Sequence, residues 1–92
     1  MFATPTHVTI AADPRRNRTI LELIAGDRPG LLSEVGKIFM AERVDVQGAR
    51  IMTVGERAED VFYVADAAGQ PLSDETAQRL EQRLLEALDR KA

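Results

Sequence analysis

The segment Asp27–Leu32, which reads Asp-Arg-Pro-Gly-Leu-Leu, has the residue types in this chain that best suit the binding of a small anion. Gly30 carries no side chain, so a ligand can approach the backbone there. The free amides at the start of a following helix attract a carboxylate, such as that of a free amino acid. The ammonium of that amino acid needs oxygen acceptors, for which Asp45 and the strand-end carbonyls beside it are candidates.

An ordinary helix start explains the same segment without a ligand. Asp27 can accept a hydrogen bond from a first-turn amide, and Pro29 suits the first helical position. Arg28 can pair with a ligand carboxylate, with Asp27 or only with solvent. The residue types alone therefore leave both interpretations of the segment open.

The other polar and aromatic residues indicate no catalytic or metal site. The chain has no cysteine, which excludes disulfides, thiolate zinc sites and cysteine nucleophiles. His7 is the only histidine, and because a metal site needs several ligands we expect it to be structural or exposed. Phe62 and Tyr63 suit a core or an interface better than a stacking platform.

Length and composition indicate one globular domain. The chain has 92 residues, of which 45% are hydrophobic. Its formal net charge of −3 does not favour binding to nucleic acid through bulk electrostatics. No apolar run approaches the roughly 18 residues that a membrane helix needs. Together with the lack of cysteine, these features fit a cytoplasmic location.

The first half of the chain predicts two strands and a helix. The runs Thr6–Ala12 and Thr19–Ala25 are rich in β-branched and aliphatic residues, and Asp13–Asn17 has turn chemistry, so the runs should form a hairpin. A helix should follow from about Leu31 to Glu42. Its apolar residues recur at spacings of three and four: Leu31, Leu32, Val35, Ile38 and Phe39.

The second half predicts two further strands and a final helix. In the strand Val44–Val54 the alternation changes phase, and a bulge near Gln47-Gly48 would restore one face. Gly55–Glu59 should be a turn, and Asp60–Asp66 a strand. Ser73 should cap the last helix, whose buried stripe is Ala77, Leu80, Leu84 and Leu88.

This order of elements predicts an α+β fold of the ferredoxin-like type, a four-stranded antiparallel sheet with two helices on one face. The order is the permuted ββαββα, with Thr6–Ala12 in the edge position that a last strand normally takes. We expect a single domain over residues 1–92, with a core from about 6 to 89. The open face would carry Ile20, Ile24, Val61 and Tyr63, and such apolar surface favours pairing with a second domain of this kind.

The chain resembles an ACT domain over about Thr19–Leu88. The resemblance rests on four segments: Asp27–Leu32, Val35–Phe39, Gly48–Arg57 and Glu59–Val64. The first of these marks only the broad ACT class. The stretch Gly48–Phe62, with its Gly-Glu-Arg turn and following Glu-Asp, resembles the C-terminal ACT domain of the bacterial PII uridylyltransferase/uridylyl-removing enzyme, as does ending on a helix.

That resemblance implies a regulatory role in nitrogen metabolism. The full enzyme of the family has a nucleotidyltransferase domain, a phosphohydrolase domain and two C-terminal ACT domains. Glutamine bound by the ACT region would favour removal of UMP from the PII protein, and low glutamine would favour its addition. Neither set of catalytic motifs is present in this chain, so we expect the chain to be non-catalytic and without a cofactor, with Mg²⁺ serving the full enzyme.

Carried over by position, the resemblance implies a binding site in two parts. The loop and helix start would contribute Asp27, Arg28, Pro29, Gly30, Leu31 and Leu32. The start of the third strand would supply the facing edge, with Val44, Asp45, Val46 and Gln47. Many ACT domains have an asparagine near the position of Asp45, and the aspartate here could help an ammonium or repel a carboxylate.

Two functions from different classes fit this pattern. One is an amino-acid sensor, and the other is a pairing module that binds no ligand. An acylphosphatase-like enzyme would need an Arg and an Asn around a phosphate loop, and Gly26–Gly30 lacks the extra glycines. An RNA-recognition domain needs exposed aromatics beside basic residues, and only Phe62 and Tyr63 are available.

Overall fold

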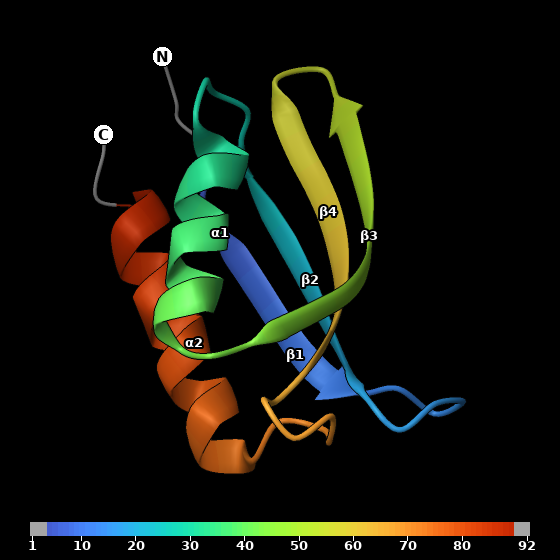
Figure 1. Cartoon of the computed structure of the whole chain (residues 1–92). Helices are drawn as coiled ribbons and strands as arrows, with labels where there is room; N and C mark the ends of the chain where they lie inside the picture. The colour runs from blue at the N-terminus through green and yellow to red at the C-terminus, as the bar shows by residue number, and fades with distance from the viewer. Residues whose placement is uncertain (1–3, 90–92) are drawn as a thin grey trace.

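The computed structural model describes residues 4–89 and shows one sheet with two helices on the same face (Figure 1). The sheet order is β1-β2-β4-β3, and every neighbouring pair is antiparallel. The predicted fold class is therefore confirmed. The ends of the predicted domain, residues 1–3 and 90–92, lie outside the described part. In chain order the elements are β1 His7–Ala12, β2 Thr19–Gly26, α1 Leu31–Ala41, β3 Asp45–Val54, β4 Arg57–Ala65 and α2 Asp74–Asp89.

Strands β1 and β2 form the predicted hairpin, and β1 lies at the edge of the sheet next to β2. The loop between them is fixed by Asp13, whose carboxylate accepts the Arg15 amide at 2.9 Å and Arg18 Nε at 2.9 Å. These two hydrogen bonds hold the pKa of Asp13 below its ordinary value. The far end of β1 is tied to the end of α2, because the Thr6 amide donates to Asp89 Oδ1 at 3.0 Å.

The core lies between the helices and the three strands β1, β2 and β4. Phe39 of α1 meets Phe62 of β4 edge to face, with ring centroids 5.2 Å apart. The predicted stripe of α2 is confirmed at its three leucines, and that of α1 at Leu31, Val35 and Phe39. Leu32 is the exception, with 47% of its surface exposed. It lines a groove together with Ile51 and Thr53 of β3.

Strand β3 is the second edge of the sheet and is poorly covered. The predicted bulge is confirmed, because the pairing passes from Val46↔Val64 to Gly48↔Tyr63. The helices lie over the other strands (Figure 1), and apolar side chains of β3 are therefore exposed on both of its faces. Those exposed by 44–47% are Val46, Ile51, Met52 and Val54.

The prediction for the open face was right about its residue types but not about their exposure. The four residues are partly buried: Ile20, Ile24, Val61 and Tyr63. The central strands shield one another, and the guanidinium of Arg18 covers the Tyr63 ring at 4.3 Å from its centroid. The most exposed apolar row of the sheet is therefore on β3.

Two connections differ from the sequence prediction or extend it. Strand β4 begins at Arg57, earlier than the predicted Asp60, because Arg57, Ala58 and Glu59 pair with the end of β3. The turn is shortened to Gly55 and Glu56, and Gly55 has φ 62, which suits a tight hairpin. At the start of α2, Ser73 Oγ accepts the Thr76 amide at 3.1 Å, so the predicted cap is confirmed.

Candidate ligand-binding site

A groove lies between the N-terminal end of α1 and the second half of β3. We call it the α1–β3 groove. Its volume is about 230 Å³, far more than the ~10–15 Å³ that one water needs, so it has room for a small organic molecule. Of the predicted site residues it contains five from the loop and helix start. The lining residues are Asp27, Arg28, Gly30, Leu31, Leu32, Ser33, Ile51, Thr53, Ala58 and Asp60.

The start of α1 has no side-chain cap among the described residues. Gly30 is the N-cap in a left-handed conformation, with φ 82, which a residue with a side chain rarely adopts. The amides of Leu32 and Ser33, both in the groove lining, are therefore left for an anion, which the helix dipole also favours.

This geometry corrects the prediction of an ordinary helix start. Asp27 does not cap α1. Instead its backbone amide donates to the carbonyl of Glu56 at 2.9 Å, which fixes the loop to the β3–β4 turn. Pro29 precedes the N-cap and does not occupy the first helical position. The left-handed Gly30 turns the chain after Pro29, and the first helical residue is Leu31, as predicted.

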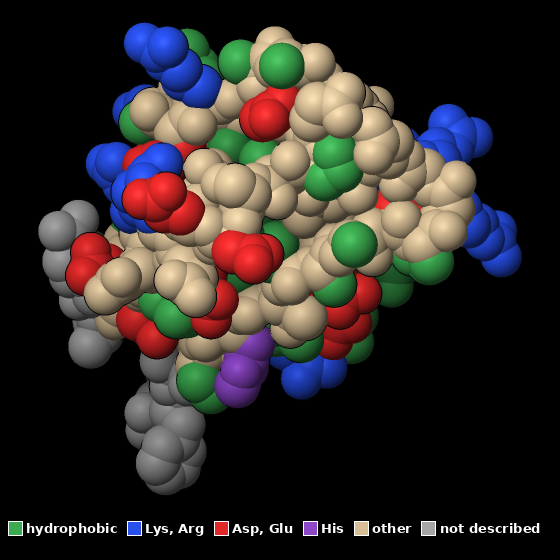
Figure 2. Space-filling view, turned by 90° about the horizontal axis from the view of Figure 1, so that it is seen from below, with side chains coloured by type: hydrophobic (Ala, Val, Ile, Leu, Met, Phe, Trp, Pro, Cys, Tyr) green, Lys and Arg blue, Asp and Glu red, His purple; other side chains and the backbone are tan. Residues whose placement is uncertain are grey.

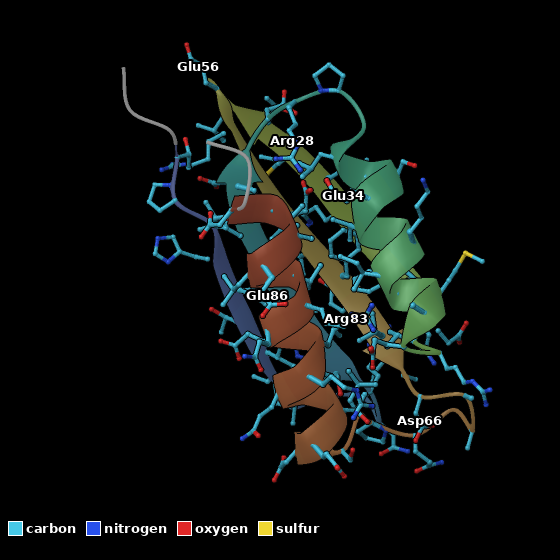
Figure 3. All side chains as sticks on the ribbon, turned by 90° about the vertical axis from the view of Figure 1, so that its left-hand side faces the viewer. Arg28, Glu34, Glu56, Asp66, Arg83 and Glu86 are labelled. Atoms are coloured by element: carbon cyan, nitrogen blue, oxygen red, sulfur yellow. The ribbon has the colours of Figure 1, made fainter. Side chains whose placement is uncertain are left out.

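Arg28 has partners that the sequence did not indicate. Its Nη1 donates to the carbonyl of Leu88 at 3.3 Å, in the last turn of α2, and its Nη2 pairs with Glu34 of α1. Figure 3 shows Arg28 near Glu34, at the end of the domain where α1 begins and α2 ends. The guanidinium therefore holds the loop to both helices, and any ligand carboxylate would compete with Glu34 for it.

Asp60 lies at the floor of the groove and was not predicted as a site residue. It is 2% exposed, and its Oδ1 accepts the Met52 amide at 3.2 Å. Its Oδ2 is also buried and has no partner among the described residues. Burial raises the pKa of Asp60, the hydrogen bond from Met52 opposes this, and the charge of Asp27 adds to the rise.

The sequence carried a signal for Asp60 that the predicted strand limits concealed. With β4 starting at Arg57, the positions that alternate onto the helix-facing side are 58, 60, 62 and 64. Ala58, Phe62 and Val64 are apolar and buried, and Asp60 is the one charged residue among them. A charged residue at a core position of a strand is a mark of function or of a specific partner.

The four residues predicted on the start of β3 do not join the groove within one chain. Val44 is buried in the core, and Asp45, Val46 and Gln47 are exposed. Asp45 pairs with Ala65, whereas Ile51 of the groove pairs with Asp60. Six residues of strand separate the two positions, which is about 20 Å. The groove takes its β3 residues from the far half of the strand.

Other surfaces offer less for chemistry. Among residues 4–89, no three His, Cys, Asp or Glu side chains are grouped so that they could hold a metal ion. No helix of the described chain is long and apolar enough to span a bilayer. His7 is exposed, and Phe62 is in the core. In the view of Figure 2, Lys and Arg side chains lie at separate places with Asp and Glu among them.

Fold and groove together define a small α+β domain with an open groove beside the start of α1. Residues 19–88 match the family model of the ACT domain, and the chain belongs to the ACT domain family. It is similar to the bifunctional uridylyltransferase/uridylyl-removing enzymes of three bacteria. The identity over 88 residues is 53% for Stutzerimonas stutzeri (strain A1501), 50% for Pseudomonas aeruginosa (strain LESB58) and 53% for Azotobacter vinelandii (strain DJ). These matches cover 95% of this chain and 10% of each relative, so the chain spans about a tenth of their length.

Proposed function

We propose that this chain is the regulatory ACT domain of a bifunctional uridylyltransferase/uridylyl-removing enzyme and that it binds glutamine. The observation that carries the proposal is a groove at an uncapped helix start, in a domain about half identical to part of those enzymes. Catalytic domains outside this chain, with their Mg²⁺, would add UMP to the PII protein and remove it. High glutamine would favour removal, in the cytoplasm.

The helix start supports this assignment because it suits the group that all free amino acids share. A carboxylate placed at the amides of Leu32 and Ser33 would accept charge-assisted hydrogen bonds. Gly30 leaves the backbone open there, since nothing lies within 4 Å of where a Cβ would stand. The exposed side chains of Leu32 and Ile51 offer apolar contact for the ligand's methylene groups.

Pairing through β3 would bring the rest of the predicted site to the groove. The outer edge of β3 has unpaired backbone groups and exposed apolar side chains, which suits addition of a second strand. If β3 pairs antiparallel with β3 of another ACT domain, the Asp45 end of one strand lies beside the Val54 end of the other. Residues 44–47 of the second domain would then approach the α1–β3 groove.

A groove completed by two domains provides a mechanism for regulation. Glutamine shifts an equilibrium only if it binds one arrangement of the paired domains better than another. A site with one half on each domain meets this requirement, because rotation of one domain against the other changes its shape. The catalytic domains would respond to that rotation.

A ligand-free pairing module is the second candidate. It is favoured by the same exposed row of β3, which would be covered by a partner whether or not a ligand binds. The two candidates differ only in the use of the α1–β3 groove. Blocking the groove separates them.

Titration calorimetry with L-glutamine, with serine and phenylalanine for comparison, tests the proposal when combined with the solution mass. Leu32→Asp places a negative charge at the groove, where it repels a carboxylate while still suiting the helix dipole. Gln78→Asp makes the same charge change on an exposed position of α2 and is the matched control. We expect heat from glutamine with the wild type and Gln78→Asp but not with Leu32→Asp. A stable dimer that gives no heat with any amino acid would leave the pairing module.

A further inference from the structure

We propose that Asp60 is the residue that anchors the ammonium group of the bound amino acid, through the carboxylate oxygen Oδ2. This inference rests on the proposed amino-acid binding and deepens it. It makes the α1–β3 groove selective for zwitterionic amino acids over similar acids that lack the amino group.

Asp60 has one carboxylate oxygen that no donor uses among the described residues. Oδ1 of Asp60 has the Met52 amide, but Oδ2 has no donor among the described residues although it is buried. A buried carboxylate oxygen without a donor is costly, and native proteins rarely retain one without a function or an unseen partner. A ligand ammonium would supply the missing donor together with a positive charge.

The two sides of the groove favour opposite charges. Asp27 is close enough to Asp60 for its charge to raise the pKa of Asp60, so two carboxylates favour a cation on this side. The first-turn amides of α1 favour an anion on the other side. Arg28, the one basic side chain of the lining, is engaged by Glu34 and by the Leu88 carbonyl. The groove therefore suits a molecule that carries both charges.

Access to Oδ2 requires a movement that the structure permits. Because the oxygen is buried, the ligand must displace side chains of the rim to reach it. Leu32 and Ile51 are the apolar members of the lining that remain 47% exposed, so little packing opposes their rotation. Binding would move these side chains and give the buried oxygen a donor.

Calorimetry on two ligands and three proteins tests the proposal. The ligands are L-glutamine and glutaramate, which keeps the carboxylate and the side-chain amide but has no amino group. The proteins are the 92-residue wild type, Asp60→Asn and, as the matched control, Asp74→Asn on the exposed first turn of α2. Losing a hydrogen bond to a charged group weakens binding by about tenfold or more.

We expect the wild type and Asp74→Asn to bind glutamine about tenfold or more tightly than glutaramate. Asp60→Asn should lose this preference, while its affinity for glutaramate stays within about threefold of the wild-type value. An Asp60→Asn protein that keeps the preference would overturn the inference and leave a buried water as the partner of Oδ2. A wild type that binds both ligands equally overturns this inference alone. A wild type that binds neither ligand also removes the proposed function.

A second measurement covers the case in which Asp60→Asn fails to fold. The pKa of Asp60 can be followed by carboxyl carbon NMR in the wild type, with and without L-glutamine. An ammonium at Oδ2 favours the charged carboxylate, so we expect the pKa of Asp60 to fall when glutamine binds. A pKa that glutamine does not change, at saturating ligand, would overturn the inference.

Discussion

Strands β4 and β3 are neighbours in one sheet, yet they bury very different parts of their side chains. On β4 the inward residues Phe62 and Val64 are covered by α1 and α2. On β3 every residue except Gly48 is exposed. The covered half of the domain provides stability, and the uncovered half holds the groove and the open strand edge.

Asp60 lies where these two halves meet. It belongs to a core strand, and its one hydrogen bond comes from the backbone of β3. This small domain thus places a buried polar group without a partner at the boundary of its core, beside the α1–β3 groove.

The largest effect should come from truncating the core. Leu84 of α2 is fully buried, and Leu84→Ala should lower the free energy of unfolding by about 2–5 kcal/mol, since it leaves a cavity. Met52→Ala on β3, where the side chain is 46% exposed, should cost less than about 1 kcal/mol. Urea denaturation of both variants measures the difference. Equal losses would show that β3 is packed in solution and would break the comparison.

Asp60→Asn should have a smaller effect of the opposite sign. It removes a buried charge and keeps the size of the side chain, so we expect a gain of about 1 kcal/mol at neutral pH. The folded-state pKa of Asp60 is raised, so the unfolded chain ionises first as the pH increases. Wild-type stability should therefore fall, relative to the variant, from about pH 4 up to the folded-state pKa.

Urea denaturation across that pH range measures the gap in unfolding free energy between the wild type and Asp60→Asn. The gap should widen as the pH rises through this window and then stay constant. A gap that does not change with pH would mean that Asp60 ionises as easily in the fold as in the unfolded chain.

The smallest effect should come from the contact between the two helices. Glu42, just after α1, accepts Arg79 Nε and Arg83 Nη1 of α2, each at 2.7 Å. These hydrogen bonds lower the pKa of Glu42, so its stabilising contribution is present above the unfolded-state pKa and is lost as the pH falls through the folded-state value. Both arginines are about half-exposed, so Glu42→Gln should cost only about 0.5–1 kcal/mol.

Thermal melts at pH 7 and pH 3 check this prediction. The Glu42→Gln protein should be less stable than the wild type at pH 7 and should approach it at pH 3. Glu86→Gln on the exposed side of α2 is the control and should match the wild type at both values. If Glu42→Gln is less stable than the wild type by the same amount at both pH values, the result would contradict an ionic role for Glu42.

The elements of the core could be predicted from the sequence because they depend on local patterns. The leucine stripe of α2, the Ser73 cap and the bulge at Gln47-Gly48 each follow from spacing or from a single residue type, and each is confirmed. The start of β4 could not be predicted in this way. Arg57 and Glu59 have turn-like chemistry, and only their pairing with β3 makes them strand.

The site was predicted only in part because it depends on contacts between distant segments. The loop and helix start were identified from Asp27–Leu32, and five of those residues line the groove. The role of Arg28 depends on its hydrogen bond to Leu88, and the exposure of Leu32 depends on where α2 packs in the fold. No local sequence pattern predicts either of these. Asp60 was missed because its orientation follows from the register of β4.

Mapping the amide shifts of the ¹⁵N-labelled chain during titration with L-glutamine tests the central claim most directly. We predict saturable shifts that are largest at Leu32 and Ser33, whose amides would meet the carboxylate, and at Met52, whose amide shares Asp60 with the ligand. The loop around Arg15 and the outer face of α2 should not respond. Saturable shifts centred on that loop, or no shifts at millimolar glutamine, would contradict the account.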